Sequence, residues 1–104
     1  MINSIVISGI VGKKEVKEYN GAKFVVLKIA VNDGFGENKL TYWFTVKVNA
    51  PHMSNYVETF VNVGDLMFVR GKMVNKMIDI EGKETAYWQL IAEQVELVRQ
   101  KKSE

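Results

Sequence analysis

The chain has 104 residues, of which 47% are hydrophobic and 25% charged, so it is long enough for one globular domain and too apolar to be disordered. Its formal net charge of +2 is too small to argue for a nucleic-acid ligand, and the positions of the lysines must decide that question. The absence of cysteine excludes disulfides and thiolate metal sites, and neither a signal peptide nor a membrane-spanning run is visible, which predicts a cytoplasmic protein.

The first half of the chain is predicted to form three consecutive strands. Residues 2–12 are rich in β-branched side chains and predict a strand that bends at its glycines. Asn20-Gly21 is the strongest short hairpin signal and leads into a second strand over residues 23–32. After a flexible, glycine-containing loop, residues 39–50 form the third strand.

The second half begins with a change of period. After Pro51, apolar residues recur at helical spacing and predict one short helix that ends before Gly64. Residues 65–77 predict a fourth strand, bent at Gly71. A hairpin then leads into the last strand, over residues 86–98.

The predicted order of elements is β-β-β-α-β-β. This is the order of the OB-fold, an all-β, five-stranded Greek-key barrel with one short helix between strands 3 and 4. Five strands in an open sheet would leave two edges unpaired, whereas closure into a barrel removes them. We therefore expect one OB-fold domain over residues 1–98 and a short solvated tail over residues 99–104.

The functional prediction starts from the third strand, KLTYWFTVKVNA (39–50), whose alternate residues point to opposite faces. The expected core face consists of Leu40, Tyr42, Phe44, Val46 and Val48. The opposite face consists of Thr41, Trp43, Thr45, Lys47 and Asn49. Its tryptophan is therefore predicted to lie on the outer wall of the barrel, where OB-folds bind oligonucleotides.

Aromatic rings mixed with lysines are what single-stranded nucleic acid requires, because bases stack on rings while ammonium groups contact phosphates. The predicted contacts are Trp43, Thr45, Lys47 and Asn49 on the third strand, Phe24 and Lys28 on the second, Phe35 at the tip of the loop between them, and Lys72 and Lys76 on the fourth. A solvated surface explains such lysines equally well. In GKKEVKE (12–18), a turn region by this interpretation, glutamates alternate with the lysines and offset their charge.

The aromatic residues also have structural interpretations. Trp43 could lie in a subunit interface, Phe35 could pack on its own loop, and Phe24 is better explained by packing than by ligand contact. Of the adjacent Tyr87 and Trp88 on the last strand, alternation places one in the core and the other outside it. We expect Trp88 to be the structural one.

The polar residues support no catalytic or metal site. His52 is the only histidine, and its position after Pro51 suits a helix-capping or surface residue. A serine triad therefore lacks a base, and no cluster of histidines and carboxylates has metal-ligand spacing. GFGENK has neither the spacing nor the following helix of a phosphate-binding loop. We expect no enzymatic activity, no metal and no cofactor.

The sequence resembles the bacterial single-stranded DNA-binding protein family. In NSIVISGIVGKKEVKEYNGAKFVVLKIAVN an Asn opens the first strand, a Gly-x-hydrophobic-Gly bend follows, and a Glu-Val pair precedes a glycine turn. Three further features are similar to the family pattern: the tryptophan of the third strand, the segment YVETFVNVGDLMFVRGKM and the segment AYWQLIAEQVEL. The resemblance covers about residues 1–98 and is that of a distant member, or of one from a phage or mobile element.

The resemblance implies particular DNA contacts. The family's stacking aromatic in the loop between the second and third strands corresponds to Phe35, and its third-strand tryptophan corresponds to Trp43. Its hairpin tryptophan falls near Met77 or Ile78, where a methionine would contact a base more weakly, and a basic hairpin residue matches Lys76.

Three departures from the family pattern reduce the implied contacts. Asn49 stands where the family has a stacking phenylalanine, and Thr45 stands where it has an arginine. The sequence ends in KKSE, without the acidic, phenylalanine-capped tip that recruits partner enzymes in the family.

We predict a non-catalytic, sequence-independent single-stranded DNA-binding protein of replication, recombination and repair, associated with the nucleoid and not with a membrane. The resemblance implies a homotetramer, with a dimer as the alternative, and replication proteins as further partners. Three other functions stay open: a dimeric primosome-type adaptor that binds DNA weakly, an RNA-binding OB domain, and a small hydrolase.

Overall fold

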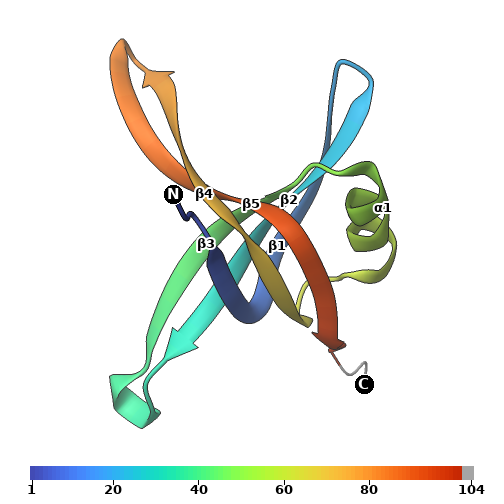
Figure 1. Cartoon of the computed structure of the whole chain (residues 1–104). Coiled ribbons are helices and arrows are strands. Elements are labelled where there is room, and N and C mark those ends of the chain that lie inside the picture. Colours follow the sequence, from blue (N-terminus) through green and yellow to red (C-terminus); the bar gives the residue numbers. More distant parts are fainter. Residues whose placement is uncertain (102–104) are drawn as a thin grey trace.

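Five strands close into a barrel in the computed structural model, which describes residues 1–101 (Figure 1). The strands are β1 (Ile5–Tyr19), β2 (Ala22–Asp33), β3 (Leu40–Val48), β4 (Leu66–Ile80) and β5 (Lys83–Arg99). Around the barrel they follow the order β1-β2-β3-β5-β4. One helix, α1 (Pro51–Phe60), connects β3 to β4, and a short 3-10 turn, η1 (Gly36–Asn38), lies between β2 and β3. The predicted OB-fold is confirmed.

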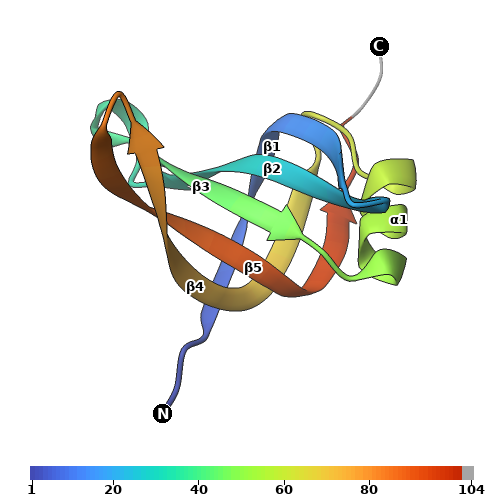
Figure 2. The same ribbon diagram turned by 90° about the horizontal axis from the view of Figure 1, so that it is seen from above.

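Alternate residues of the strands fill the barrel interior. Val25, Leu27 and Ile29 of β2 are fully buried, and the residues between them lie on the outer wall. Val57 of α1 and Val61 just after it join the same core, and α1 lies across one end of the barrel (Figure 2). Alternation along each strand therefore decides which side chains face a ligand on the outer wall.

Three hairpins continue beyond the barrel as two-stranded arms (Figure 1). The outermost cross-strand pairs are Tyr19 with Ala22 in the β1–β2 arm, Asp33 with Leu40 in the β2–β3 arm and Ile80 with Lys83 in the β4–β5 arm. Lys13, Lys14 and Lys17 therefore lie within β1, and their assignment to a turn region is wrong. The ladder turns only at Asn20 and Gly21, whose φ angles of 52° and 81° suit a tight hairpin.

The first half of β3 belongs to the β2–β3 arm and not to the barrel. Leu40 and Tyr42 were predicted to be core residues, but both are exposed, so this prediction is wrong for them. Phe44 is half-buried, and Val46 and Val48 are fully buried. The side chains alternate along the whole strand, but only the part from Phe44 onward lines the barrel interior.

Side chains from other elements support the segment around the end of α1. Lys14 of β1 donates from Nζ to the carbonyl oxygens of Glu58 and Val61, both at 2.7 Å. These carbonyls lie where a helix leaves acceptors without partners. The buried Asp65 accepts from the backbone N–H of Lys101 through Oδ1 at 2.8 Å, and it also accepts from the backbone N–H of Asn62.

Part of the expected tail is structured. Arg99 lies in β5, and the Lys101 amide is held by Asp65. Residues 102–104, the end of the expected solvated tail, lie outside the described residues.

The start of α1 makes no use of a side-chain cap. Pro51 occupies the first turn, where its fixed φ suits a helix, and the N-cap residue, Ala50, makes no side-chain bond. His52 is exposed, so its interpretation as a surface residue holds and the capping interpretation is wrong. Within residues 1–101, no helix combines the length and apolarity needed to cross a membrane. The same residues contain no group of three or more histidines, cysteines and carboxylates placed to hold a metal ion.

Candidate nucleic-acid interface

The outer wall over β2 and β3 carries the residues that the sequence singled out. Cross-strand pairs place Val26 beside Lys47, Lys28 beside Thr45, and Ala30 beside Trp43. Lys28 donates from Nζ to Oγ1 of Thr45 at 2.7 Å, which holds the lysine along the wall. This register places Trp43, Thr45 and Lys47 on the face away from the core, as predicted.

Two arms flank this wall and form a hollow of about 360 Å³, which we call the groove. Its floor consists of Phe24, Val26 and Lys28 from β2 and Thr45 and Lys47 from β3. Its sides consist of Glu15 and Lys17 from the β1–β2 arm and Lys76, Tyr87 and Gln89 from the β4–β5 arm. The two arms diverge above the barrel in Figure 1.

A second hollow of about 450 Å³ continues the groove along the β1–β2 arm. It shares Phe24 and Lys47 with the groove and adds Tyr19, Lys23 and Asn49. Because the two hollows share these two residues, they lie next to each other on the barrel wall.

Positive charge dominates the middle of the groove. Lys47 lies over the ring of Phe24, with Nζ 4.6 Å from the ring centroid. Desolvation lowers the pKa of Lys47 below its ordinary value of 10.5, and the neighbouring Lys76 ammonium lowers it further. The two ammonium groups repel each other, and a phosphate bound between them would reduce this repulsion.

The one carboxylate in the groove is already neutralised by lysines. Nζ of Lys13 lies 2.7 Å from the Glu15 carboxylate and Nζ of Lys17 lies 3.5 Å from it. The hydrogen bond and charge of Lys13, and then the charge of Lys17, hold the pKa of Glu15 below its ordinary value. The prediction that glutamates offset these lysines is confirmed for Glu15.

Trp43 lies on the same wall, two residues along β3 from Thr45. Its indole extends over β2 to Gly12 of β1, where a β-bulge interrupts the register between Val11 and Lys13. The side chain is nevertheless 59% exposed. A ring supported on one side and open to solvent on the other is what base stacking requires.

The structure brings most of the predicted contacts together. Phe24, Lys28, Thr45, Lys47, Asn49 and Lys76 line the two hollows, and Trp43 lies on the same wall. Phe35 is 93% exposed in the β2–β3 loop and lines neither hollow. Lys72 and Met77 are also exposed outside them. Met77 lies on the opposite face of the β4–β5 arm, because it alternates with the groove residue Lys76.

Sequence reasoning missed Tyr87 and Gln89 on β5 and misjudged Trp88. Trp88 was expected to be structural, but it is 59% exposed, so that prediction is wrong. It shares its face with the fully buried Leu90, but the barrel ends near Leu90, and Trp88 lies beyond it in the arm. The signal in the sequence was the polar Gln89 beside the apolar Leu90: with Leu90 in the core, alternation places Tyr87 and Gln89 on the outer wall.

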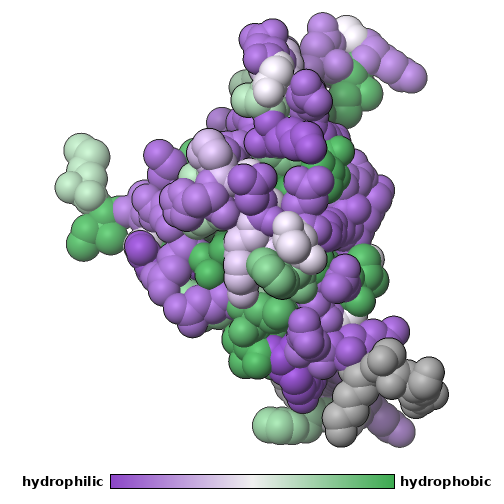
Figure 3. Space-filling model, turned by 90° about the vertical axis from the view of Figure 1, so that its right-hand side faces the viewer, coloured by the Kyte–Doolittle hydropathy of each residue, from purple (hydrophilic) through white to green (hydrophobic). Residues whose placement is uncertain are grey.

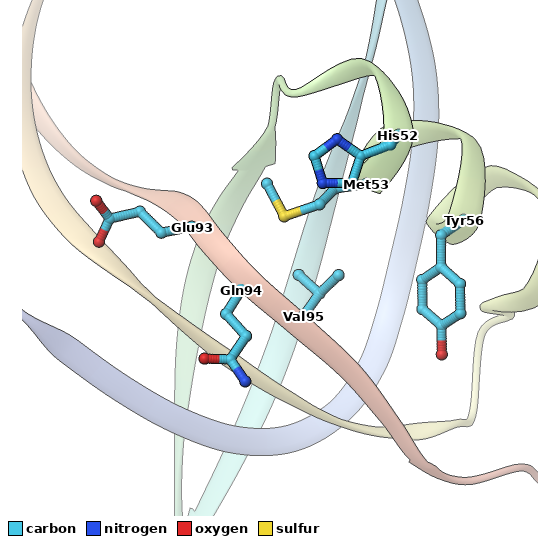
Figure 4. Close-up of a pocket in the computed structure, with 6 residues that line it drawn as sticks. All are labelled: His52, Met53, Tyr56, Glu93, Gln94 and Val95. Carbon is cyan, nitrogen blue, oxygen red and sulfur yellow. The ribbon is translucent and has the colours of Figure 1, made fainter.

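Other faces of the molecule have fewer features that suit a nucleic-acid ligand. The side that carries α1 is mostly hydrophilic, with scattered apolar residues (Figure 3). A hollow of about 350 Å³ lies between α1 and β5, lined by His52, Met53, Tyr56, Glu93, Gln94 and Val95 (Figure 4). Its lining includes the apolar side chains of Met53 and Val95, and it contains no lysine or arginine to attract phosphates.

Comparison with solved structures shows the shared fold. A Plasmodium falciparum SSB complex with ssDNA superposes with a TM-score of 0.84 at 17% identity, covering 97% of this chain and 96% of that one. The S. cerevisiae mitochondrial single-stranded DNA-binding protein Rim1 gives 0.73 at 20% identity, over 95% and 98% of the two chains. A small single-stranded DNA-binding protein from Streptomyces coelicolor gives 0.73 at 18%, over 94% and 96%.

Sequence comparison identifies the family. A search of curated proteins finds no match. The model of the single-strand binding protein family matches residues 2–98, which is nearly the whole chain. The chain therefore belongs to the single-strand binding protein family, and it binds single-stranded DNA.

Proposed function

We propose that single-stranded DNA lies along the groove in a mode that is largely independent of sequence. Bases stack on Trp43, while Lys28, Lys47 and Lys76 neutralise phosphates. Thr45 and Asn49 provide polar contacts along β3, and Phe24 supports Lys47 from below. Phe35, Lys72 and Met77 contact the strand only where it continues beyond the groove.

One observation carries this proposal: an exposed indole and three lysines from three different strands converge on one wall of the barrel. Trp43 is supported by Gly12, Lys28 is held by Thr45, and Lys47 lies beside Lys76. A purely structural tryptophan would be covered, and purely solvated lysines would be spread apart to reduce their repulsion.

Titration with oligo-dT tests the proposal. In a Trp88→Phe background, Trp43 is the only tryptophan, so quenching of its fluorescence reports stacking at this ring. We expect quenching at low salt and weaker binding as salt rises, because bound phosphates release counterions from the strand. Unquenched fluorescence despite binding, or an affinity that does not depend on salt, contradicts the proposed mode. A matched RNA oligomer separates this function from an RNA-binding OB domain, for which the 2′-hydroxyl would raise affinity.

The cellular role follows from this mode of binding. A protein that covers single strands without reading their sequence protects the intermediates of replication, recombination and repair, and we place it in the cytoplasm at the nucleoid with replication proteins as partners. The groove also favours direct DNA binding over a primosome-type adaptor. A dimer with poor affinity for oligo-dT would favour the adaptor instead.

Self-association into a homotetramer, with a dimer as the alternative, is part of the proposal. In the described chain, the β1–β2 ladder begins at Ile10, whereas residues 5–9 of β1 pair only with β4. One backbone edge of this segment is free to pair with a second copy, and Val6 is exposed there. Sedimentation should detect a multimer that Val6→Lys weakens. A monomeric wild-type protein at micromolar concentration would exclude this arrangement.

A further inference from the structure

The groove contains a polar side chain that the proposed binding mode does not use. Gln89 of β5 is only 5% exposed, yet it lines the groove. Its Oε1 atom is buried and accepts no hydrogen bond from any residue that the structure describes. Buried amide oxygens are nearly always paired, because leaving one unpaired destabilises the fold.

The neighbours of Gln89 provide no hydrogen bond to its Oε1 atom. Val74, its partner across the β4–β5 ladder, offers no polar side-chain group. Lys47, Lys76 and Tyr87 line the same groove and carry hydrogen-bond donors, but none of them reaches Oε1. The groove therefore combines donors that suit phosphates or base carbonyls with one buried, unpaired acceptor that suits neither.

The chemistry of DNA limits what this acceptor could bind. Phosphates are acceptors only, and the sugars within a deoxyribose chain have no hydroxyl to donate. The bases alone carry N–H donors, and two of these, the ring N–H groups at N3 of thymine and N1 of guanine, lie on the edge that pairs in a duplex. In double-stranded DNA these ring N–H groups are already used, whereas in a single strand they are free.

We propose that Gln89 is a base-edge acceptor: its Oε1 receives a hydrogen bond from an N–H on the Watson–Crick edge of one base held in the groove. This inference rests on the proposed function and adds to it. It makes the groove selective for unpaired bases and not only for flexible, charged chains. Since Oε1 is buried in the free protein, this hydrogen bond requires the amide to rotate toward the groove when a base binds.

The test compares oligo-dT with the same oligomer made from N3-methylthymidine, which keeps the ring but lacks the N3–H donor. We expect wild-type protein to bind the methylated strand about three- to tenfold more weakly, the usual worth of one neutral hydrogen bond. Gln89→Leu keeps the size of the side chain and removes the acceptor, so it should bind both strands equally. Gln100→Leu makes the same change at an exposed position outside the groove and should keep the wild-type preference.

The outcomes separate this inference from the proposed function. If wild-type protein binds both strands equally well, or if Gln89→Leu keeps the full preference, Gln89 does not read a base edge and the inference is wrong. The second result would assign the preference to the bulk of the methyl group. Failure of the wild-type protein to bind unmodified oligo-dT at low salt would instead contradict the proposed function. If Gln89→Leu does not fold, Gln89→Met and the wild-type comparison still decide the matter.

Discussion

The indole of Trp43 rests on Gly12. A Cβ atom added at Gly12 would lie 2.6 Å from Cζ3 and 2.8 Å from Cη2 of the Trp43 ring, closer than real Cβ atoms approach other atoms. Any larger residue at position 12 would therefore push the ring off β1. The glycine in the β1 bulge lets the indole of a β3 residue reach across β2 to the backbone of β1.

Replacing Gly12 by alanine should weaken DNA binding although residue 12 makes no contact with DNA. The displaced ring would lose part of its stacking, so we expect a loss of about 1 kcal/mol of binding free energy, at the low end of what one stacked base contributes. Oligo-dT titration measures it, with Ser8→Ala on the same strand as the control. Unchanged affinity in Gly12→Ala would mean that the position of the ring is unimportant.

Replacing Trp43 itself by alanine should remove one stacking site, at a cost of about 1–3 kcal/mol in binding. Because the side chain is largely exposed, the urea midpoint should change little. Trp88→Ala is a matched control, since Trp88 is equally exposed but lies on the other face of the β4–β5 arm. Equal losses of affinity in the two variants would show that the groove is not the main binding surface.

The lowered pKa of Lys47 predicts a pH dependence of binding. Lys47 loses its proton at a lower pH than an ordinary lysine. As the pH rises, the affinity for DNA should therefore begin to fall before the pH reaches 10.5. Lys47→Gln should remove this component and reduce the slope of log affinity against log salt by about 0.7, the value for one phosphate contact on a single strand. Lys83→Gln at the hairpin tip is the control. A pH profile shared by wild type and Lys47→Gln would contradict this role.

The same shift has a consequence for folding with a defined sign. Burial disfavours the charged form of Lys47, so its contribution to stability is greatest above pH 10.5, where the residue is neutral in both states. That contribution is lost as the pH falls through the lowered pKa of the folded protein. Urea unfolding between pH 8 and 11 measures this effect. With the other lysines alike in both proteins, the unfolding free energy of the wild type should fall less with rising pH than that of Lys47→Gln.

Lys14 should matter for stability and not for binding. Its two hydrogen bonds to carbonyls at the end of α1 are partly buried, and hydrogen bonds to charged groups are worth more than neutral ones. Lys14→Met should lower the unfolding free energy by about 2 kcal/mol. Lys13→Met, which loses only an exposed ion pair with Glu15, should lower it by less than about 1 kcal/mol. If both variants unfold alike in urea, the helix end does not depend on Lys14.

The sequence predicted the barrel because its signals are local. Asn20-Gly21 marks a turn by backbone conformation alone, and alternation in β2 separates Leu27 from Lys28 whatever surrounds them. The same alternation failed for Tyr42 and Trp88, because period two assigns a face but does not say where the barrel ends and an arm begins. Hairpin length depends on pairing between strands, and no single strand encodes it.

The groove was predictable only in part for the same reason. Lys28, Thr45 and Lys47 lie on neighbouring strands joined by one loop, so their meeting follows from a hairpin. Gln89 joins them through the parallel pairing of β3 with β5, across a helix and a further strand. The roles of Gly12 and Lys14 also depend on contacts between distant segments, which a pattern of residue types does not reveal.

β3 and β5 meet through only two residue pairs, Val46 with Leu90 and Lys47 with Ile91. This is the shortest seam of the barrel, and the groove crosses it from Thr45 to Gln89. A strand of DNA bound there would contact both β3 and β5 and hold the two strands together. Occupancy should therefore slow amide hydrogen exchange along the inner ends of both strands, including backbone groups that no nucleotide touches.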